Sequence, residues 1–296
     1  MESLFDRRSF LKTTAGAAAG LAGLGASGIL AAGTPQGTPN AEKIGWRLGC
    51  ALYTFNQFPF YEAVERNASL GLRYAEGFTW HKLSKERPNL QTNESLSADL
   101  RKEVKQKLAD SGVKLVNVYC NLGNDEAAAR KTFDFAKEMG IETLVAEPPA
   151  AAFDLIEKLC DEYKINLGIH NHPGPASTYW NPDKVLEVCK GRSKRIGACA
   201  DTGHWMRSKI EPLAAIKKLK GRIITFHFKD LNAFGPGAHD VPWGTGKGSA
   251  KAVLAEVHRQ GLKAMFSIEY EHNWGKNLPE LAQCVAFFDK TAAELA

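Results

Sequence analysis

The sequence predicts an α/β protein that folds as a (β/α)8 TIM barrel in a single domain. From residue 44 onward, short apolar runs alternate with amphipathic helical patterns. The apolar runs indicate parallel strands, because such strands are covered on both faces. Eight strand–helix units in about 250 residues match the usual size of this barrel. A doubly wound sheet is the alternative, but the residues after the first strand, Tyr53–Asn56, are not the glycine-rich turn that it requires.

The individual elements follow from these patterns. Glycines after several helical patterns, for example Gly112 and Gly140, are typical of the residue that ends a helix. The expected strands are Arg47–Tyr53, Tyr74–Phe78, Lys114–Tyr119, Thr143–Glu147, Asn166–Asn171, Ile196–Asp201, Ile223–Lys229 and Ala264–Tyr270. The expected helices are Tyr61–Ser69, Ser97–Ser111, Asp125–Met139, Ala152–Tyr163, Pro182–Cys189, Ile210–Leu219, Lys251–Gln260 and Leu278–Glu294.

The first 33 residues have the features of a twin-arginine signal peptide. Arg7 and Arg8 precede Ser-Phe-Leu, and an apolar region rich in alanine and glycine follows. The apolar region is short and glycine-rich, so a membrane anchor is disfavoured, although an uncleaved leader is an alternative. We therefore expect a signal peptide over 1–33, a linker over 34–43 and the barrel over 44–296. This organisation predicts a periplasmic protein that meets the twin-arginine translocase during export and has no stable membrane association.

Composition excludes several classes of protein. Hydrophobic residues make up 44% and charged residues 24% of the 296 residues, as in ordinary globular domains. The formal charge is +5 without a basic run, so a nucleic-acid partner is not expected. The six cysteines form no Cys-x-x-Cys pair, which favours buried free thiols over disulfides or thiolate metal sites.

Polar residues gather where the predicted strands end. In this barrel class the active site lies at the carboxyl ends of the strands, and the residues expected there are Glu76, Glu147, His170, His172, Asp201, His204, His227, Lys229, Glu269 and Glu271. Side chains two apart on a strand point to the same side, which pairs His170 with His172, His227 with Lys229, and Glu269 with Glu271. The group Glu147, Asp201, His227 and Glu269 suits one divalent ion. Mn²⁺ is the first choice, and Mg²⁺, Co²⁺ and Zn²⁺ are the alternatives.

Aromatic residues are frequent in the predicted loops at this mouth. The tryptophans expected there are Trp80, Trp180, Trp205, Trp243 and Trp274. Aromatic faces pack on the C–H faces of sugars, so a pyranose- or polyol-sized substrate is favoured. The residues expected to bind the substrate are His204, His170, Trp205, Trp243 and Glu76. The run Trp243–Gly248 resembles a phosphate loop, but Gly248 stands where the Walker pattern needs Ser or Thr, so a phosphate role is a weaker alternative.

Four motifs carry a family resemblance. They are Glu147-Pro148, Asp201-Thr-Gly-His204, His227-Phe-Lys-Asp230 and Glu269. Together they resemble the xylose isomerase-like TIM-barrel superfamily, which contains the sugar phosphate isomerases and epimerases. The resemblance covers residues 45–296. It implies one divalent metal ion held by Glu147, Asp201, His227 and Glu269, with His204 touching the substrate or the metal.

The resemblance also implies a reaction. A sugar isomerase or epimerase of this type removes a proton next to the carbonyl of a ketose or keto-sugar and passes through a metal-bound enediolate. Glu147 and Glu269 would be base and acid, while Lys229 or His172 would polarise the carbonyl or protonate a leaving oxygen.

Three alternatives remain beside this reaction. The segment His170-Asn-His172 departs from the simplest epimerase pattern, so a keto-sugar or inosose dehydratase, or a keto-glycoside lyase, is one alternative. A sugar-binding barrel without catalysis is another. The endonuclease branch is a third, but it expects several zinc ions and a basic groove. Whether the chain forms a homo-oligomer is left open.

The leader generates one prediction. Replacing Arg7 and Arg8 by lysine should leave the precursor in the cytoplasm, because the translocase recognises the arginine pair. Fractionation of cells expressing the two forms measures this, with the unchanged leader as control. Equal periplasmic yield of both forms would contradict the assignment of residues 1–33.

Overall fold

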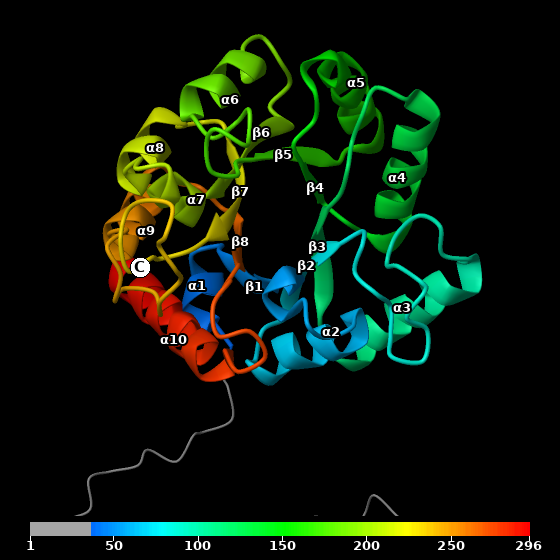
Figure 1. Cartoon of the computed structure of the whole chain (residues 1–296), viewed down its shortest axis with the longest axis horizontal. Helices are drawn as coiled ribbons and strands as arrows, with labels where there is room; N and C mark the ends of the chain where they lie inside the picture. The colour runs from blue at the N-terminus through cyan, green and yellow to red at the C-terminus, as the bar shows by residue number, and fades with distance from the viewer. Residues whose placement is uncertain (1–36) are drawn as a thin grey trace, which may run out of the picture. The chain divides into compact units, whose positions relative to one another are not determined.

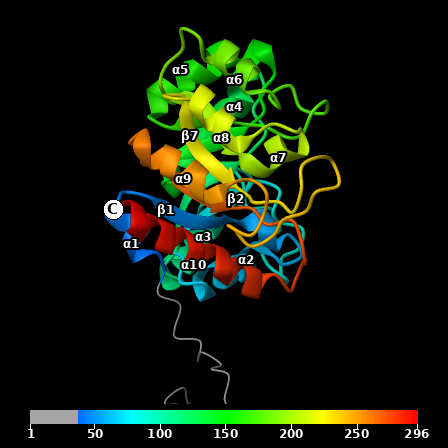
Figure 2. The ribbon, with the colours of Figure 1, turned by 90° about the vertical axis from the view of Figure 1, so that its left-hand side faces the viewer.

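The computed structural model describes residues 37–296, and the predicted signal peptide lies outside the described residues. Eight parallel strands form a closed barrel in chain order, and β8 pairs with β1 to complete the ring. The helices surround the strands, as Figures 1 and 2 show. The predicted single-domain (β/α)8 barrel is therefore confirmed.

The bounds of the elements agree closely with the sequence patterns. The strands are β1 Arg47–Ala51, β2 Tyr74–Phe78, β3 Lys114–Tyr119, β4 Thr143–Ala146, β5 Asn166–His170, β6 Ile196–Asp201, β7 Ile223–Phe228 and β8 Met265–Ile268. The α-helices are α1 Pro39–Lys43, α2 Phe60–Ser69, α3 Ala98–Asp110, α4 Glu126–Met139, α5 Phe153–Tyr163, α6 Pro182–Cys189, α7 Thr202–Arg207, α8 Pro212–Lys218, α9 Ala250–Arg259 and α10 Leu278–Leu295. Short 3₁₀ turns, η2 Leu52–Phe55 and η3 Ala150–Ala152, follow β1 and β4.

Two short helices were not expected. The carboxylate of Asp289 on α10 accepts hydrogen bonds from the backbone and side chain of Asn40 and from the backbone of Ala41, which fixes α1 within the segment 34–43 predicted to be a linker. Helix α7 begins directly after β6, because the Asp201 carboxylate caps it by accepting from the His204 backbone at 2.7 Å. Both helices depend on side-chain contacts that hydrophobic periodicity does not reveal.

The apolar core lies largely between the strands and the surrounding helices. Large buried side chains such as Trp46, Phe133 and Phe288 fill this layer. Gly49 on β1 allows close packing against β2, since a Cβ atom there would lie 2.1 Å from the Tyr74 carbonyl oxygen. All six cysteines are buried and free, which confirms the thiol prediction. Within residues 37–296, the helices are all too short or too polar to span a membrane.

Asn67 ties the first turn of the barrel together. Its buried amide oxygen accepts from the Cys50 backbone at 2.9 Å. Its amide nitrogen donates to the carbonyl oxygens of Leu72 and Tyr74 at 3.2 and 3.1 Å. One side chain on α2 therefore satisfies backbone groups on β1, on β2 and in the α2–β2 connection.

This contact predicts a stability loss. Asn67→Ala should lower the free energy of unfolding by about 3 kcal/mol, because buried backbone groups would lose their partners. Urea unfolding measures the change. The control is Gln106→Ala on the exposed face of α3, which should change stability by less than about 0.5 kcal/mol. A loss in Asn67→Ala no larger than in the control would show that water replaces the amide without cost.

Candidate active site

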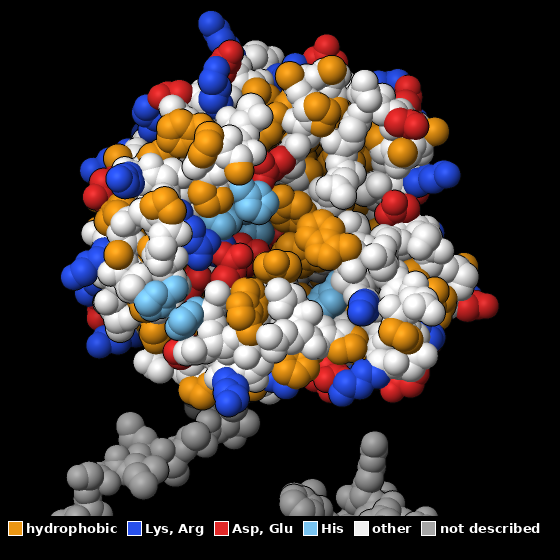
Figure 3. Space-filling model, in the orientation of Figure 1, with side chains coloured by type: hydrophobic (Ala, Val, Ile, Leu, Met, Phe, Trp, Pro, Cys, Tyr) orange, Lys and Arg blue, Asp and Glu red, His pale blue; other side chains and the backbone are white. Residues whose placement is uncertain are grey.

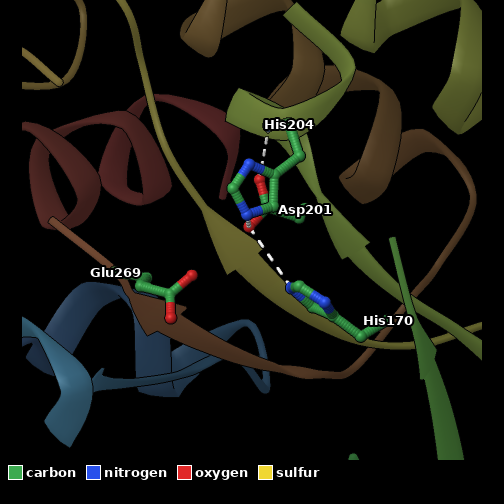
Figure 4. A group of neighbouring side chains, drawn as sticks. All are labelled: His170, Asp201, His204 and Glu269. Atoms are coloured by element: carbon green, nitrogen blue, oxygen red, sulfur yellow. Dashed lines mark hydrogen bonds and ion pairs between the residues drawn. The ribbon is translucent and has the colours of Figure 1, made fainter. Parts of the chain in front are cut away.

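Four buried side chains converge at the carboxyl ends of the strands. They are His170 at the end of β5, Asp201 at the end of β6, His204 in α7 and Glu269 directly after β8. One ligand atom from each lies within 4.8 Å of the others. Figure 4 shows the Asp201 carboxylate between the rings of His204 and His170. In Figure 3 acidic and histidine side chains form the floor of a central hollow.

Asp201 is held firmly in this group. Its backbone exchanges two hydrogen bonds with the Asn171 side chain, at 3.0 and 3.1 Å. Burial would raise the pKa of the Asp201 carboxyl, but the neighbouring His204, Lys229 and His170 outweigh burial and hold it well below its usual value. Asp201 is therefore a fixed, charged acceptor.

Two buried atoms in the group lack hydrogen bonds of normal geometry, although one of them, Asp201 Oδ2, forms an ion pair with the Lys229 ammonium at 3.1 Å. Asp201 Oδ2 and His170 Nε2 face each other at 3.5 Å, and His204 Nε2 also lies 3.5 Å from Asp201 Oδ2. Buried polar atoms normally have partners. Two imidazoles and two carboxylates around such atoms are a donor set that fits a divalent metal ion.

Glu147, expected in the same metal group as Asp201, lies in a second cluster with His170 and His172. The ring of His170 separates the two carboxylates: Nδ1 lies 3.2 Å from Glu147 Oε1, and Nε2 faces Asp201. Glu147 also contacts His172 Nδ1 and accepts from the Ser177 hydroxyl at 2.5 Å. Burial would raise the pKa of Glu147, but these hydrogen bonds outweigh it and keep the pKa well below its usual value.

His227, the other expected metal ligand, lies beside the four-residue group. Its Nε2 lies 2.6 Å from Glu76 Oε1, and its Nδ1 lies 3.0 Å from Glu269 Oε2. Burial alone would lower the pKa of His227, but the neighbouring Cys199, Glu269 and Glu76 outweigh it and raise the pKa well above its usual value. The ring of His227 therefore connects Glu76 in the barrel interior with Glu269 at the mouth.

Lys229 was expected to face the substrate, but it is fully buried behind the mouth. Its ammonium contacts Asp201 Oδ2 at 3.1 Å and the Oε2 atoms of Glu269 and Glu271 at 2.8 Å each. Burial would lower the pKa of Lys229, but these carboxylates raise it well above its usual value. Gly203 leaves room for this chain, since a Cβ atom there would lie 2.7 Å from Lys229 Cβ and Cδ. The three carboxylates therefore favour the charged form of Lys229, which makes it ill suited to donate a proton.

Three residues expected to bind substrate lie elsewhere. Trp205 and Trp243 are buried in the apolar core, and Trp243 packs against Phe228 at a centroid distance of 4.7 Å. Trp205 lies in helix α7 and Trp243 in the loop after β7, and neither lines the cavity at the mouth. Glu76 is fully buried in the barrel interior, where it accepts from Ser267 at 2.7 Å in addition to its contact with His227.

The backbone amides of the glycine loop after β7 are already hydrogen-bonded to a carboxylate of the same chain. The backbone N–H groups of Gly244, Gly246 and Gly248 donate to the Asp230 carboxylate at 2.9–3.0 Å. The amides that a phosphate would need are thus already occupied, which removes the phosphate-loop alternative for these amides.

The cavity that the group of His170, Asp201, His204 and Glu269 adjoins has a volume of about 230 Å³. Its walls are Tyr53, Phe78, Trp80, Tyr119, His170, His172, His204, Glu269 and Glu271. The sequence search for polar strand ends missed Phe78 and Tyr119, although both end a strand. It also missed Arg207, which donates to Glu271 at 2.6 Å and to His204 Nδ1 at 3.1 Å. No sequence signal pointed to Arg207, because α7 was expected to be a loop.

The sequence matches a known family of barrel proteins. The model of the xylose isomerase-like TIM barrel family matches residues 64–290. The chain belongs to this family. No curated protein matches the chain significantly.

Solved structures of this barrel type cover most of the chain. An uncharacterised protein from Parabacteroides distasonis is 30% identical over 83% of this chain and 99% of its own, with a TM-score of 0.67. A D-tagatose 3-epimerase-like protein is 18% identical over 84% and 98%, with a TM-score of 0.65. A xylose isomerase-like TIM barrel protein from Mycobacterium smegmatis, in complex with magnesium, is 15% identical over 84% and 98%, with a TM-score of 0.64.

Further structures at 14–15% identity share the barrel fold of the xylose isomerase-like family. They include an L-ribulose 3-epimerase, a probable 3-DHS dehydratase from Bacillus anthracis and a protein with a bound zinc atom. Epimerisation, dehydration and metal binding are thus all found on this barrel.

The environment of Lys229 predicts a large stability effect. Lys229→Met would leave three carboxylates grouped in the interior without their cation, so the free energy of unfolding of the metal-free protein should fall by about 3–5 kcal/mol. Urea unfolding measures the loss. The matched control, Lys247→Met on the exposed glycine loop, should change stability by less than about 0.5 kcal/mol. An unchanged midpoint for Lys229→Met would mean that the carboxylates are protonated or solvated.

Proposed function

We propose that the protein is a divalent-metal-dependent isomerase or epimerase of a ketose or keto-sugar. The observation that carries this proposal is the buried group of His170, Asp201, His204 and Glu269 at the mouth of the barrel. The family and its sugar-epimerase structures support it. Isomerisation and epimerisation move protons within the sugar without net oxidation or reduction. The reaction therefore needs no cofactor besides the metal ion.

The four residues of the buried group are the proposed metal ligands. Their two imidazoles and two carboxylates suit a transition-metal ion such as Mn²⁺, Co²⁺ or Zn²⁺ better than Mg²⁺, and we propose Mn²⁺. A bound ion would supply Lewis acidity to the substrate carbonyl, which acidifies the neighbouring C–H bond. The pKa of Glu269 is held well below its usual value: burial would raise it, but His227 and Lys229 outweigh burial. Glu269 is therefore proposed as a ligand and not as an acid.

His172 is the proposed proton carrier. It lines the mouth, its side chain is 50% exposed, and its Nδ1 contacts Glu147. A carboxylate at Nδ1 keeps the proton on that nitrogen and leaves Nε2 as the acceptor. Nε2 takes the proton from the carbon next to the carbonyl, and Glu147 stabilises the imidazolium that forms. Return of the proton to the former carbonyl carbon, with transfer of the hydroxyl proton between the two oxygens, gives the isomer. Formation of the epimer requires a second proton donor on the opposite face of the same carbon, because His172 lies on one face only.

A dehydratase or lyase on the same site is the second candidate. The accessible His172 favours it, because an imidazolium at the mouth can protonate an oxygen that leaves from the carbon next to the enolised position. Carbon–hydrogen cleavage is the first step in both reactions. They differ in whether the proton returns to carbon or an oxygen departs.

The place of action is proposed from the leader. A periplasmic location follows if Arg7 and Arg8 direct export by the twin-arginine route. That route carries folded proteins, so the metal would be inserted before export.

The two candidate ligand sets give opposite predictions for Glu147. Asp201→Asn should lose most of the bound metal, whereas Glu147→Gln should keep it, because Glu147 is separated from the buried group by His170. Elemental analysis after loading with Mn²⁺ and desalting gives the stoichiometry. Loss of metal in both variants would restore the set predicted from sequence, and full metal in both would rule out either set.

The proton-transfer role gives a kinetic prediction. His172→Asn should lower turnover by about 10²–10⁴-fold while metal content and melting temperature stay unchanged. A panel of ketoses and inososes in D₂O, followed by NMR, measures turnover and separates enolisation from loss of water. The control is His239→Asn, at a half-buried histidine that stacks on His272 outside the cavity. Equal turnover in the two variants would remove His172 from the mechanism.

A further inference from the structure

We infer that the substrate is a two-ring sugar, and that a second cavity beside the mouth binds the ring that does not react. This inference rests on the proposed function for the sugar class and extends it to the size of the substrate. The outer cavity has a volume of about 490 Å³ and shares the walls Tyr53, Phe78 and Trp80 with the inner one. A ligand in the inner cavity can therefore extend directly into the outer one.

Volume is the first argument. Small-molecule sites usually enclose about 300–1,000 Å³. The inner cavity, at about 230 Å³, falls below this range, whereas the outer cavity lies within it. A ligand confined to the inner cavity would leave the larger of the two spaces unused. The pair of cavities fits a molecule with one ring over the buried group and one ring outside it.

The outer cavity is a built site, because hydrogen bonds join its two loops. The loop after β1 and the long loop between β2 and α3 form its walls. The Phe60 backbone donates to the Lys82 carbonyl at 2.7 Å, and His81 Nε2 donates to the Phe58 carbonyl at 2.7 Å. Burial lowers the pKa of His81, so the neutral ring is kept in this contact. The antiparallel bridge between Lys82 and Gln91 fixes the long loop further.

The lining matches the chemistry of a sugar ring. The side chain of Trp80 is 39% exposed, and among residues 37–296 it is the one large hydrophobic side chain that is exposed to solvent. It packs edge-on against Phe78 and Tyr119, at centroid distances of 5.2 and 5.3 Å, which orients its ring at the junction of the cavities. An exposed, oriented indole is the side chain that stacks on the C–H face of a sugar.

Polar groups at the outer cavity can bind hydroxyls. Asn56 and Gln57 present side-chain amides, and the buried Ser84 hydroxyl makes no hydrogen bond of normal geometry. Lys82 and Lys85 also line the cavity, and the Lys85 ammonium pairs with Glu62 at 2.6 Å; the described lining residues themselves include no carboxylate. A sugar ring can use both the aromatic and the hydrogen-bonding parts of this lining, whereas an aliphatic or plain aryl group can use only the aromatic part.

Calorimetric binding tests the inference without requiring turnover. The probes are cellobiose, lactose, maltose and sucrose against glucose, galactose and fructose, with p-nitrophenyl β-glucoside as an aryl comparison. At least one disaccharide should bind about tenfold more tightly than its component monosaccharides. Because Trp80 lines both cavities, Trp80→Ala should weaken binding of that disaccharide several-fold more than binding of its component monosaccharides. Trp180→Ala, at a partly buried tryptophan of another loop outside both cavities, should keep the advantage of the disaccharide.

Three outcomes would overturn the inference. They are equal affinity for one-ring and two-ring sugars, an equal loss in Trp80→Ala for both, and a preference for the aryl glucoside over every disaccharide. The binding test is independent of the proposed reaction. If the protein binds disaccharides more tightly but converts none of the sugars tested, the outer site is supported and only the proposed isomerase or epimerase activity is contradicted.

Discussion

The site depends on the ion pairs that the buried Lys229 ammonium forms with three carboxylates. Asp201 ends β6, while Glu269 and Glu271 follow β8, and all three carboxylates point at the same buried nitrogen. Three anions in the interior would repel one another strongly without a cation. Lys229, which follows β7, therefore allows acidic groups from the ends of the two flanking strands, β6 and β8, to converge. Arg207 extends the same compensation outward to Glu271 and Asp240.

A polar column continues from this cluster into the barrel. Glu269 contacts His227, His227 contacts Glu76, and Glu76 accepts from Ser267. Barrels of this class are normally filled by branched apolar side chains, so hydrogen-bonded polar groups at these positions mark a departure from pure packing. Each member has a partner, which keeps the column rigid. The floor of the mouth is thus fixed from beneath by the barrel interior.

The fold followed from the sequence because barrel strands are encoded locally, by apolar runs and helix-ending glycines. The polar strand ends also identified Asp201, His170, His204 and Glu269 as residues of the mouth. The grouping of these residues was harder to predict. Strand parity gives the direction of a side chain but not its depth, so it could not show that His170 separates Glu147 from Asp201 or that Lys229 is buried behind the mouth. Trp205 and Trp243 were expected in loops at the mouth, whereas both are buried and Trp205 lies in α7; the sequence between the predicted strands and helices carried no periodic signal for this burial.

Closure of the ring has a consequence for how the chain is made. Gly49 of β1 pairs with Ser267 of β8, and helix α1 is held by Asp289 of α10, so the first and last parts of the described chain complete each other. Contacts between such distant segments form slowly, because the whole intervening loop must be ordered first. The ribosome must release nearly the entire chain before the barrel can close, and until then β1 has an open edge. A chaperone that shields this edge during synthesis would act on a nascent chain whose mouth, with its buried charges, is still incomplete.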